Sequence, residues 1–154
     1  MFIRMLSTDY MKDTDITMSI SASLLPPDKQ PSIRVLAMPA DTNAAGDIFG
    51  GWLMSQIDIA GSIIAYRRAA GRVVTVAVNN FEFIKPVFVG DLVSIFADLG
   101  KVGNSSMAIE ISAYAERNRG QNECHLVARA ILTYVAIDEN RKPRSIERQR
   151  PGIT

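Results

Sequence analysis

The sequence predicts an α+β domain in which a largely antiparallel sheet is built around one long helix. A single apolar segment of helical length runs from Gly51 to about Ala70, and the chain after it consists of strand-like runs joined by turn sequences. The chain has 154 residues, of which 47% are hydrophobic, so it can bury one core of its own. We therefore expect one domain over residues 31–140, a flexible extension over residues 1–30 and a basic tail over residues 141–154.

Charge and cysteine content narrow the classes of partner. The 17 basic and 16 acidic side chains give a net charge of +1, so no overall field favours nucleic acid or an anionic membrane. One cysteine excludes an internal disulfide, and one histidine beside it makes a zinc site improbable. No apolar run approaches the roughly 20 residues that cross a bilayer, and the N-terminal stretch is a poor secretory signal. We expect a cytoplasmic protein that binds no nucleic acid, no membrane and no metal.

The first strand is expected over residues 32–38, where apolar residues alternate until Pro39 stops them. A long turn over residues 40–51 follows. Its Asp41 stands in a typical loop sequence, for which turn formation is the expected role.

The predicted helix is apolar on every side, so we expect it to be buried nearly all round, by a curled sheet or by a second subunit. Asp58 shares its narrow polar seam with Ser55 and Ser62. Burial raises the pKa of such a carboxyl unless it is paired or hydrogen-bonded, and both a structural and a functional role stay open for it. Gly71 is the expected C-cap, after arginines that suit the negative end of the helix dipole.

Four further strands are expected at residues 73–84, 90–99, 107–114 and 125–137, with polar turns at residues 100–104 and 118–123 between them. The first of these strands is long and β-branched, and it is our candidate for pairing edge to edge with a second chain. The cations of the tail are expected to be solvated; the alternative is attraction of a polyanionic ligand.

The turn into the helix combines Asp47 with Gly46, Gly50 and Gly51. Glycines allow sharp bends and close approach, and the amides of a helix start are unpaired donors. A carboxylate here is either a favourable partner of the helix dipole or a general base beside donors that hold a developing oxyanion. The local pattern leaves both interpretations open.

An ordered series of motifs covers roughly residues 32–146. It consists of Leu36-Ala37-Met38-Pro39, Asp41-Thr42-Asn43, Gly46-Asp47-Ile48-Phe49-Gly50-Gly51-Trp52, Met54-Ser55-Gln56 with Asp58, Arg72-Val73-Val74-Thr75-Val76, Phe83-Ile84-Lys85-Pro86, Gly90-Asp91, Val102-Gly103 with Ser105-Ser106, and Thr133-Tyr134-Val135-Ala136. This series resembles the YciA-type acyl-CoA thioesterases of the hotdog superfamily. The resemblance implies an antiparallel sheet wrapped around one long central helix, a double-hotdog homodimer, commonly a trimer of dimers, and hydrolysis of acyl-CoA to free acid and CoA.

The resemblance also implies roles for particular residues. Asp47 would be the general base, or less certainly a nucleophile, beside oxyanion-binding amides at Gly50 and Gly51. Asp58 ranks second as a catalytic carboxylate, which would share the work from the facing subunit, and Asn43 would help to position water or the carbonyl. The substrate-binding candidates are Thr75 and Asn79 near the acyl carbonyl, and Arg72, Lys85, Lys101, Ser105 and Ser106 for the CoA phosphates; Trp52, Met54 and Phe83 would line an acyl channel. No cofactor is expected, because coenzyme A is part of the substrate and product.

Three alternatives remain. A hotdog dehydratase or hydratase needs a histidine near the helix entry, and the only histidine, His125, lies in the last predicted strand. Its neighbour Cys124 is not a convincing nucleophile with it, since successive strand residues point to opposite faces. The presence of Asp47 argues weakly against a non-enzymatic acyl-CoA sensor, and the sequence leaves open a structural subunit whose fold serves assembly alone.

Overall fold

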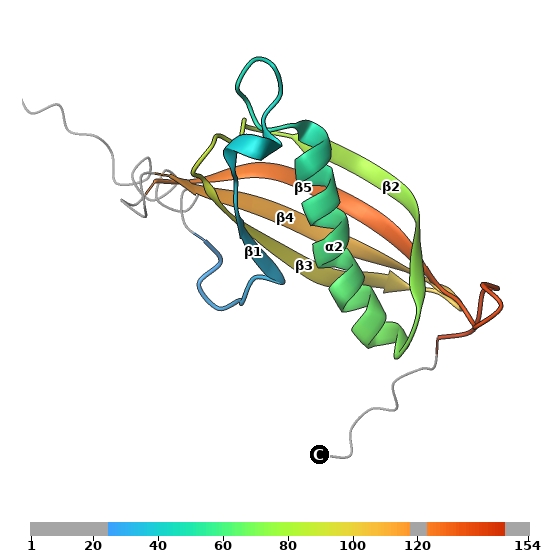
Figure 1. The fold of residues 1–154 in the computed structure, drawn as a ribbon. Coiled ribbons are helices and arrows are strands. Elements are labelled where there is room, and N and C mark those ends of the chain that lie inside the picture. The colour runs from blue at the N-terminus through green and yellow to red at the C-terminus, as the bar shows by residue number, and fades with distance from the viewer. Residues whose placement is uncertain (1–24, 118–122, 147–154) are drawn as a thin grey trace, which may run out of the picture.

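One long helix lies across one face of a five-stranded antiparallel sheet in the computed structural model, which describes residues 25–117 and 123–146 (Figure 1). The elements are β1 (Ile33–Leu36), the short 3-10 helix η1 (Pro39–Asp41), α2 (Gly50–Ala69), β2 (Val73–Phe83), β3 (Leu92–Val102), β4 (Ser106–Arg117) and β5 (Glu123–Ala136). The strand order is β1-β3-β4-β5-β2, so the predicted α+β architecture is confirmed. Residues 1–24 of the predicted extension, residues 118–122 of the predicted turn and residues 147–154 of the predicted tail lie outside the described residues.

The central strands follow the two-residue period of the sequence. Along β4, Met107, Ile109, Ile111, Ala113 and Ala115 are buried, while the residues between them are more exposed. The buried row joins the hydrophobic core that contains Leu53 and Ile57 of α2. The sheet face under the helix is therefore the core of the domain.

The expectation that α2 is buried nearly all round was wrong for the single chain. Its buried residues form one stripe: Leu53, Ile57, Ala60, Gly61, Ala65 and Ala69. Met54, Ile59 and Tyr66 are 38%, 48% and 57% exposed. The physical reason is that the sheet covers α2 from one side and does not close around it (Figure 1). Within the described residues, no helix has both the length and the apolarity needed to span a membrane.

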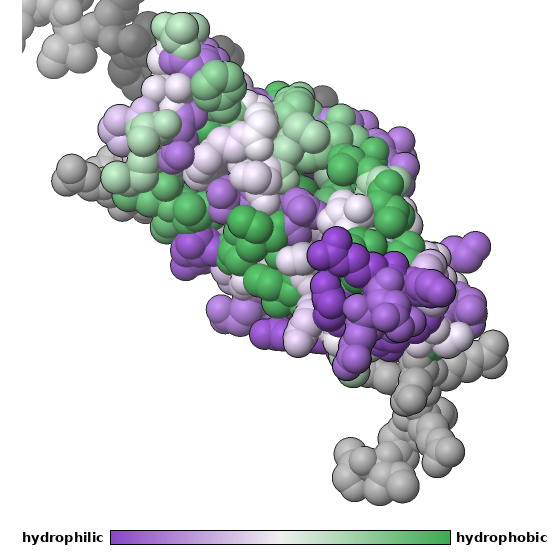
Figure 2. Space-filling model, turned by 45° about the vertical axis from the view of Figure 1, so that its right-hand side comes forward, coloured by the Kyte–Doolittle hydropathy of each residue, from purple (hydrophilic) through white to green (hydrophobic). Residues whose placement is uncertain are grey.

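β2 is an edge of the sheet, and its outward apolar residues are uncovered. Val74, Val76 and Val78 are 40%, 56% and 46% exposed. Figure 2 shows hydrophobic side chains in patches across the middle of one face, and hydrophilic ones gathered at its lower end. The predicted strand is thus confirmed as an element and as an edge, while its pairing with a second chain stays a prediction.

Two local predictions are corrected. The ladder of β3 continues to Val102 through an irregularity that begins after Leu99, so the turn starts at Gly103, whose N–H donates to the Ser106 carbonyl at 2.8 Å. The residue with left-handed backbone after α2 is Ala70, with φ 47°, and its N–H donates to Arg67. In both places the backbone pattern of the tertiary structure outweighs the preference of a nearby glycine.

The start of the predicted basic tail is docked, so the solvated interpretation was wrong for this part. The Arg144 guanidinium donates from Nη2 to the Ala69 carbonyl at 2.6 Å and from Nε to the Ile137 carbonyl at 3.2 Å. Ile146 is 6% exposed, and its N–H donates to the Asn104 carbonyl at 2.7 Å. A cation at the C-terminal carbonyls of α2 interacts favourably with the negative end of the helix dipole.

Candidate active site

The loop before α2 is organised by Asn43. Its side-chain Oδ1 accepts the backbone N–H groups of Ala45 at 2.9 Å and Asp47 at 3.2 Å, and its own N–H donates to the Asp47 carbonyl at 2.8 Å. Gly46 takes φ +89°, a conformation that suits glycine. The Asp47 side chain is exposed at the end of this turn. Asn43 therefore fixes the backbone of Asp47.

The N-terminus of α2 is left open. Its N-cap is Phe49, which makes no side-chain capping hydrogen bond, and its first turn holds no acid. The N–H of Leu53 donates to the Phe49 carbonyl at 3.3 Å, so the amides of Gly50 and Gly51 precede the first intrahelical bond. Such amides at the positive end of a helix dipole bind anions and oxyanions.

A mainly apolar cavity of about 340 Å³ adjoins this helix end. It is lined by Ile48, Phe49, Gly50, Leu53, Phe83, Ile84, Lys85, Pro86 and Val87. A Cβ on Gly50 would lie 3.1 Å from Cζ of Phe83, so a side chain there would crowd the phenyl ring. Of the three residues expected to line an acyl channel, Phe83 lines this cavity, while Trp52 packs against the core and Met54 is exposed.

Asp58 is engaged by two hydroxyl groups from the sheet. Its Oδ1 accepts from Thr75 Oγ1 at 2.6 Å and from Tyr134 Oη at 3.0 Å, and the same tyrosine also donates to the Asp58 carbonyl at 2.8 Å. Burial, and then the charge of Asp58, raise the pKa of Tyr134, which keeps this phenol a donor. Asp58 stands eight residues beyond Gly50, roughly 12 Å along the helix axis. The structure therefore joins Asp58 to Thr75 and leaves both away from the helix entry of the same chain.

The remaining binding candidates lie in different places. Asn79 donates from Nδ2 to Thr133 Oγ1 at 3.1 Å on the β2–β5 ladder, and Lys85 lines the cavity. Arg72 follows the C-terminal end of α2, and its carbonyl accepts from the Ile137 N–H. Lys101 lies at the end of β3, Ser105 in the β3–β4 turn, where its carbonyl accepts from the Ala136 N–H, and Ser106 at the start of β4. α2 has 20 residues, about 30 Å of helix. In one chain these residues therefore do not meet Asp47.

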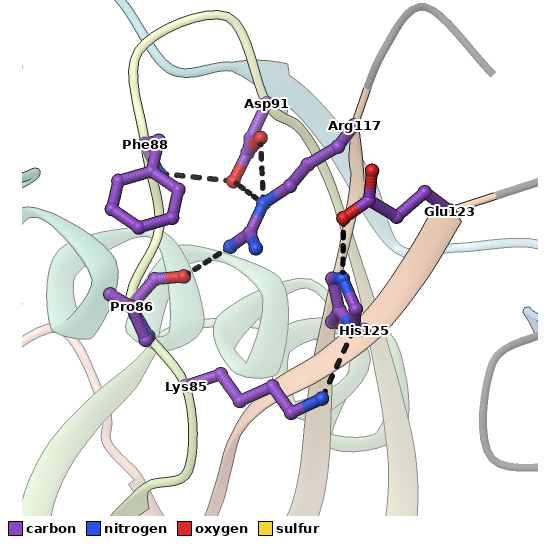
Figure 3. A network of polar contacts seen from close by, with 7 residues as sticks. All are labelled: Lys85, Pro86, Phe88, Asp91, Arg117, Glu123 and His125. Atoms are coloured by element: carbon purple, nitrogen blue, oxygen red, sulfur yellow. Dashed lines mark hydrogen bonds and ion pairs between the residues drawn. The ribbon is translucent and has the colours of Figure 1, made fainter. Parts of the chain in front are cut away.

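The lone histidine lies on β5, where it contacts Glu123 of the same strand and Lys85, which follows the end of β2. His125 Nδ1 lies 3.2 Å from Lys85 Nζ, and Nε2 lies 3.0 Å from Glu123 Oε1 (Figure 3). An ammonium can only donate, so Nδ1 accepts and Nε2 carries the proton when the ring is neutral. Cys124 is buried, and burial followed by the charge of Glu116 raises the pKa of its thiol. Neither residue is among those that line the cavity at the helix entry.

One network of polar contacts was not predicted from the sequence. Arg117, at the end of β4, donates from Nε to Asp91 Oδ2 at 3.1 Å and from Nη2 to the Pro86 carbonyl at 2.6 Å (Figure 3). Its guanidinium carbon lies 4.4 Å from the centroid of the Phe88 ring. Arg117 and Asp91 are 26 residues apart, so no local motif links them, and only the Gly90-Asp91 dipeptide belongs to the family motifs of the sequence.

Comparison with known proteins identifies the family. A family model described as "Thioesterase superfamily" matches residues 45–120. The acyl-CoA thioester hydrolase YciA of Escherichia coli is 47% identical over 116 residues, which are 74% of this chain and 88% of that protein. An "Uncharacterized acyl-CoA thioester hydrolase" of Haemophilus influenzae is 48% identical over 119 residues, covering 76% of this chain and 77% of the relative.

Solved structures agree. A hexameric thioesterase from Yersinia pestis superposes with a TM-score of 0.74 at 50% identity, over 79% of this chain and 98% of that one. An aspartate-to-alanine mutant of a hexameric broad-specificity acyl-coenzyme A thioesterase gives a TM-score of 0.75 at 46% identity, over 79% and 89% of the two chains. With its helix packed on a five-stranded antiparallel sheet, the chain belongs to the YciA-type acyl-CoA thioesterases of the hotdog superfamily.

Proposed function

We propose that the chain hydrolyses acyl-CoA to a free carboxylic acid and CoA without a metal ion, with Asp47 as general base and the first amides of α2 as oxyanion donors. The observation that carries this proposal is the uncapped, glycine-lined helix start, which lies three residues after Asp47 and beside an apolar cavity. The relatives named as acyl-CoA thioester hydrolases support the reaction class.

The chemistry needs little beyond these parts. The thioester carbonyl oxygen points at the Gly50 and Gly51 amides, and the acyl chain enters the cavity. The oxygen of a water molecule attacks the carbonyl carbon while Asp47 takes a proton from that water. The amides stabilise the tetrahedral oxyanion that forms. Collapse breaks the C–S bond, and the departing CoA thiolate takes the proton back from Asp47.

A nucleophilic role for Asp47 is the second form of the mechanism. Its carboxylate would attack the thioester and release CoA, leaving a mixed anhydride that water hydrolyses. Single turnover in ¹⁸O-labelled water separates the two forms. General-base attack puts the label into the first product acid and leaves the protein unlabelled, whereas hydrolysis of an anhydride at the aspartyl carbonyl labels Asp47.

The proposed assembly is a homodimer made by edge pairing of β2, within a hexamer of three such dimers. A two-fold axis at paired β2 edges makes the two copies of α2 run in opposite directions, because each helix has a fixed direction relative to its own β2. The N-terminal end of one helix is then directed toward the C-terminal end of the other. Arg72, Lys101, Ser105 and Ser106 of one chain would so bind the CoA phosphates of a substrate that reacts at Asp47 of its partner. The hexameric relatives support an assembly of this kind.

The first experiment measures release of free thiol from saturated acyl-CoA at neutral pH, with and without EDTA. Wild-type protein should be active in both, and Asp47→Asn should lower turnover by at least about 100-fold while CoA binding and assembly are kept. Asp58→Asn is the matched variant. It should keep most of the turnover, because Asp58 is held by Thr75 and Tyr134. Full activity of Asp47→Asn would end the mechanism or move the base to Asp58.

Mixed oligomers test the shared site. Asp47→Asn and the double variant Arg72→Glu/Lys101→Glu should each be weakly active alone. Mixed dimers of the two contain one site with a native Asp47 and native cations, so activity should rise above that of both parents. No gain on mixing would place the phosphate site within one chain.

A further inference from the structure

We infer that Arg117 is a positioning residue for the active site: its guanidinium, through Asp91 and the Pro86 carbonyl, fixes the backbone to which the helix entry is hydrogen-bonded. The inference rests on the proposed function only in taking the helix entry as the place of the reaction. Arg117 does not line the cavity, so its role is exerted through other residues.

The pair of Arg117 and Asp91 closes the loop between β2 and β3. The two side chains are 18% and 4% exposed. Arg117 reaches the start of the loop at the Pro86 carbonyl, and Asp91 reaches its middle by accepting the Phe88 N–H at 3.0 Å. The Phe88 ring under the guanidinium adds a cation–π contact. Loop residues 86–91 are thus held at both ends by one largely buried ion pair (Figure 3).

One route from this pair leads through Val87. The Val87 carbonyl accepts the Ile48 N–H at 3.2 Å. Both residues are buried, at 4% and 8% exposure. Ile48 follows Asp47 directly, so the position of the proposed base depends on the residue next to the Pro86 carbonyl that Arg117 holds.

A second route leads through the end of β1. The Ala37 N–H donates to the Asp91 carbonyl at 2.9 Å, and the Gly90 N–H donates back to the Ala37 carbonyl at 2.8 Å. The next turn is closed by Asp41, whose Oδ2 accepts the Met38 N–H at 2.9 Å and whose carbonyl accepts the Phe49 N–H at 3.0 Å.

The two routes end on consecutive amides, those of Ile48 and Phe49. Ile48 and Phe49 are the two residues between Asp47 and Gly50. They therefore separate the proposed base from the first proposed oxyanion donor. A shift of the 86–91 loop therefore changes the distance between the groups that must act together. A displacement of about 1 Å at a reacting centre can cost on the order of 100-fold in rate.

Arg117→Lys is the informative substitution, because it keeps the positive charge and loses the planar guanidinium group with its fixed N–H donors. One ammonium cannot reproduce the fixed geometry in which Nε meets Asp91 while Nη2 meets the Pro86 carbonyl. Arg117→Ala removes the group entirely and is paired with added ethylguanidinium, which can fill the vacated site. The matched control is Asp98→Asn, which breaks the exposed ion pair between Lys29 and Asp98, with side chains 52% and 55% exposed, on the same sheet.

The measurements are kcat and KM for acyl-CoA, corrected for folded protein and taken at equal oligomeric state. Arg117→Lys should lower kcat about 10- to 100-fold with KM within about twofold. Ethylguanidinium should restore part of the kcat of Arg117→Ala, and Asp98→Asn should stay within about twofold of wild type. A kcat of Arg117→Lys and Arg117→Ala equal to wild type per folded molecule would overturn the inference, and so would a change confined to KM.

Hydrogen exchange keeps this test separate from the proposed reaction. The Ile48 and Phe49 amides should exchange faster in Arg117→Lys than in wild type, while the central amides of β4 remain protected in both. This result is independent of any thioesterase activity, so inactive wild-type protein would refute the proposed function alone. Unchanged exchange at both amides would refute the positioning role.

Discussion

The two ends of α2 are built in opposite ways. At the N-terminus, Phe49 supplies no capping side chain, and Gly50 and Gly51 follow it. At the C-terminus, the N–H groups of Ala70 and Gly71 close back onto the last turn, and the Arg144 guanidinium donates to the Ala69 carbonyl. The protein satisfies carbonyls at the C-terminal end, whereas the N-cap of the amide end makes no side-chain hydrogen bond.

We therefore expect the C-terminal end of α2 to contribute to stability and its N-terminal end to take part in the proposed reaction. A capping side chain contributes typically about 1 kcal/mol, and the N-terminus of α2 goes without one. Local rules are broken at functional sites and kept elsewhere. The closed end anchors α2 to the segment that follows β5, while the open end faces the cavity, which is lined by Ile48, Phe49 and Gly50.

Removing a single N–H from the open end should produce the largest effect. Gly51→Pro deletes one donor in the first helical turn, where proline is tolerated, and kcat should fall about 100- to 1000-fold. Gly51→Ala is the control, since it keeps the N–H and its Cβ meets nothing within 4 Å. Thiol release and circular dichroism are measured on both variants. A native spectrum with native kcat in Gly51→Pro would rule out that amide as a donor.

Opening the closed end should change stability and leave catalysis alone. Arg144→Met removes a charged hydrogen-bond donor from the Ala69 carbonyl, and the free energy of unfolding should fall by about 1.5–3 kcal/mol. kcat should stay within about twofold, because Arg144 donates to backbone carbonyls and is not one of the residues proposed to bind CoA or to catalyse the reaction. Denaturation at fixed protein concentration measures the free energy of unfolding. Lys142→Met is the control, because Lys142 is an exposed neighbour of Arg144. A loss of kcat without a loss of stability would contradict the contrast between the two ends.

The middle of the helix should give the smallest change. Tyr134→Phe removes the hydroxyl that binds Asp58 and should cost about 1–2 kcal/mol at neutral pH. Because burial and the charge of Asp58 raise the pKa of Tyr134 in the folded protein, its contribution is complete below the ordinary value and is lost as pH rises through the folded pKa. At pH 10.5 the loss is about 0.8 kcal/mol, for an ordinary pKa of about 10.

Denaturation at pH 9 and pH 10.5 measures this effect. The stability difference between wild type and Tyr134→Phe should narrow over that interval. A constant difference would mean that Tyr134 ionises at the same pH in the folded and unfolded chains.

Much of the fold was readable from local pattern. The alternation from Met107 to Ala113 predicts β4, and the continuous apolar segment after Gly51 predicts α2, because both signals lie within one element. The helix-entry motif with Asp47 likewise lies within ten residues of sequence, and its role stays a prediction. In the single chain the sheet covers α2 from one side, and cover of the other side by a second subunit stays a prediction, because a sequence that is apolar all round does not say which surface covers each side.

What the sequence determined by itself is the order and type of the elements, the family, and the place of Asp47 three residues before the start of α2 at Gly50. The tertiary structure alone decided that Arg144 closes the helix from 75 residues away, that Asp58 is bound by Tyr134, and that Arg117 holds the loop next to the helix entry. The physical reason is distance along the chain. Periodicity and turn chemistry act between neighbours, whereas an ion pair or a side-chain cap exists only after the sheet has brought remote segments together.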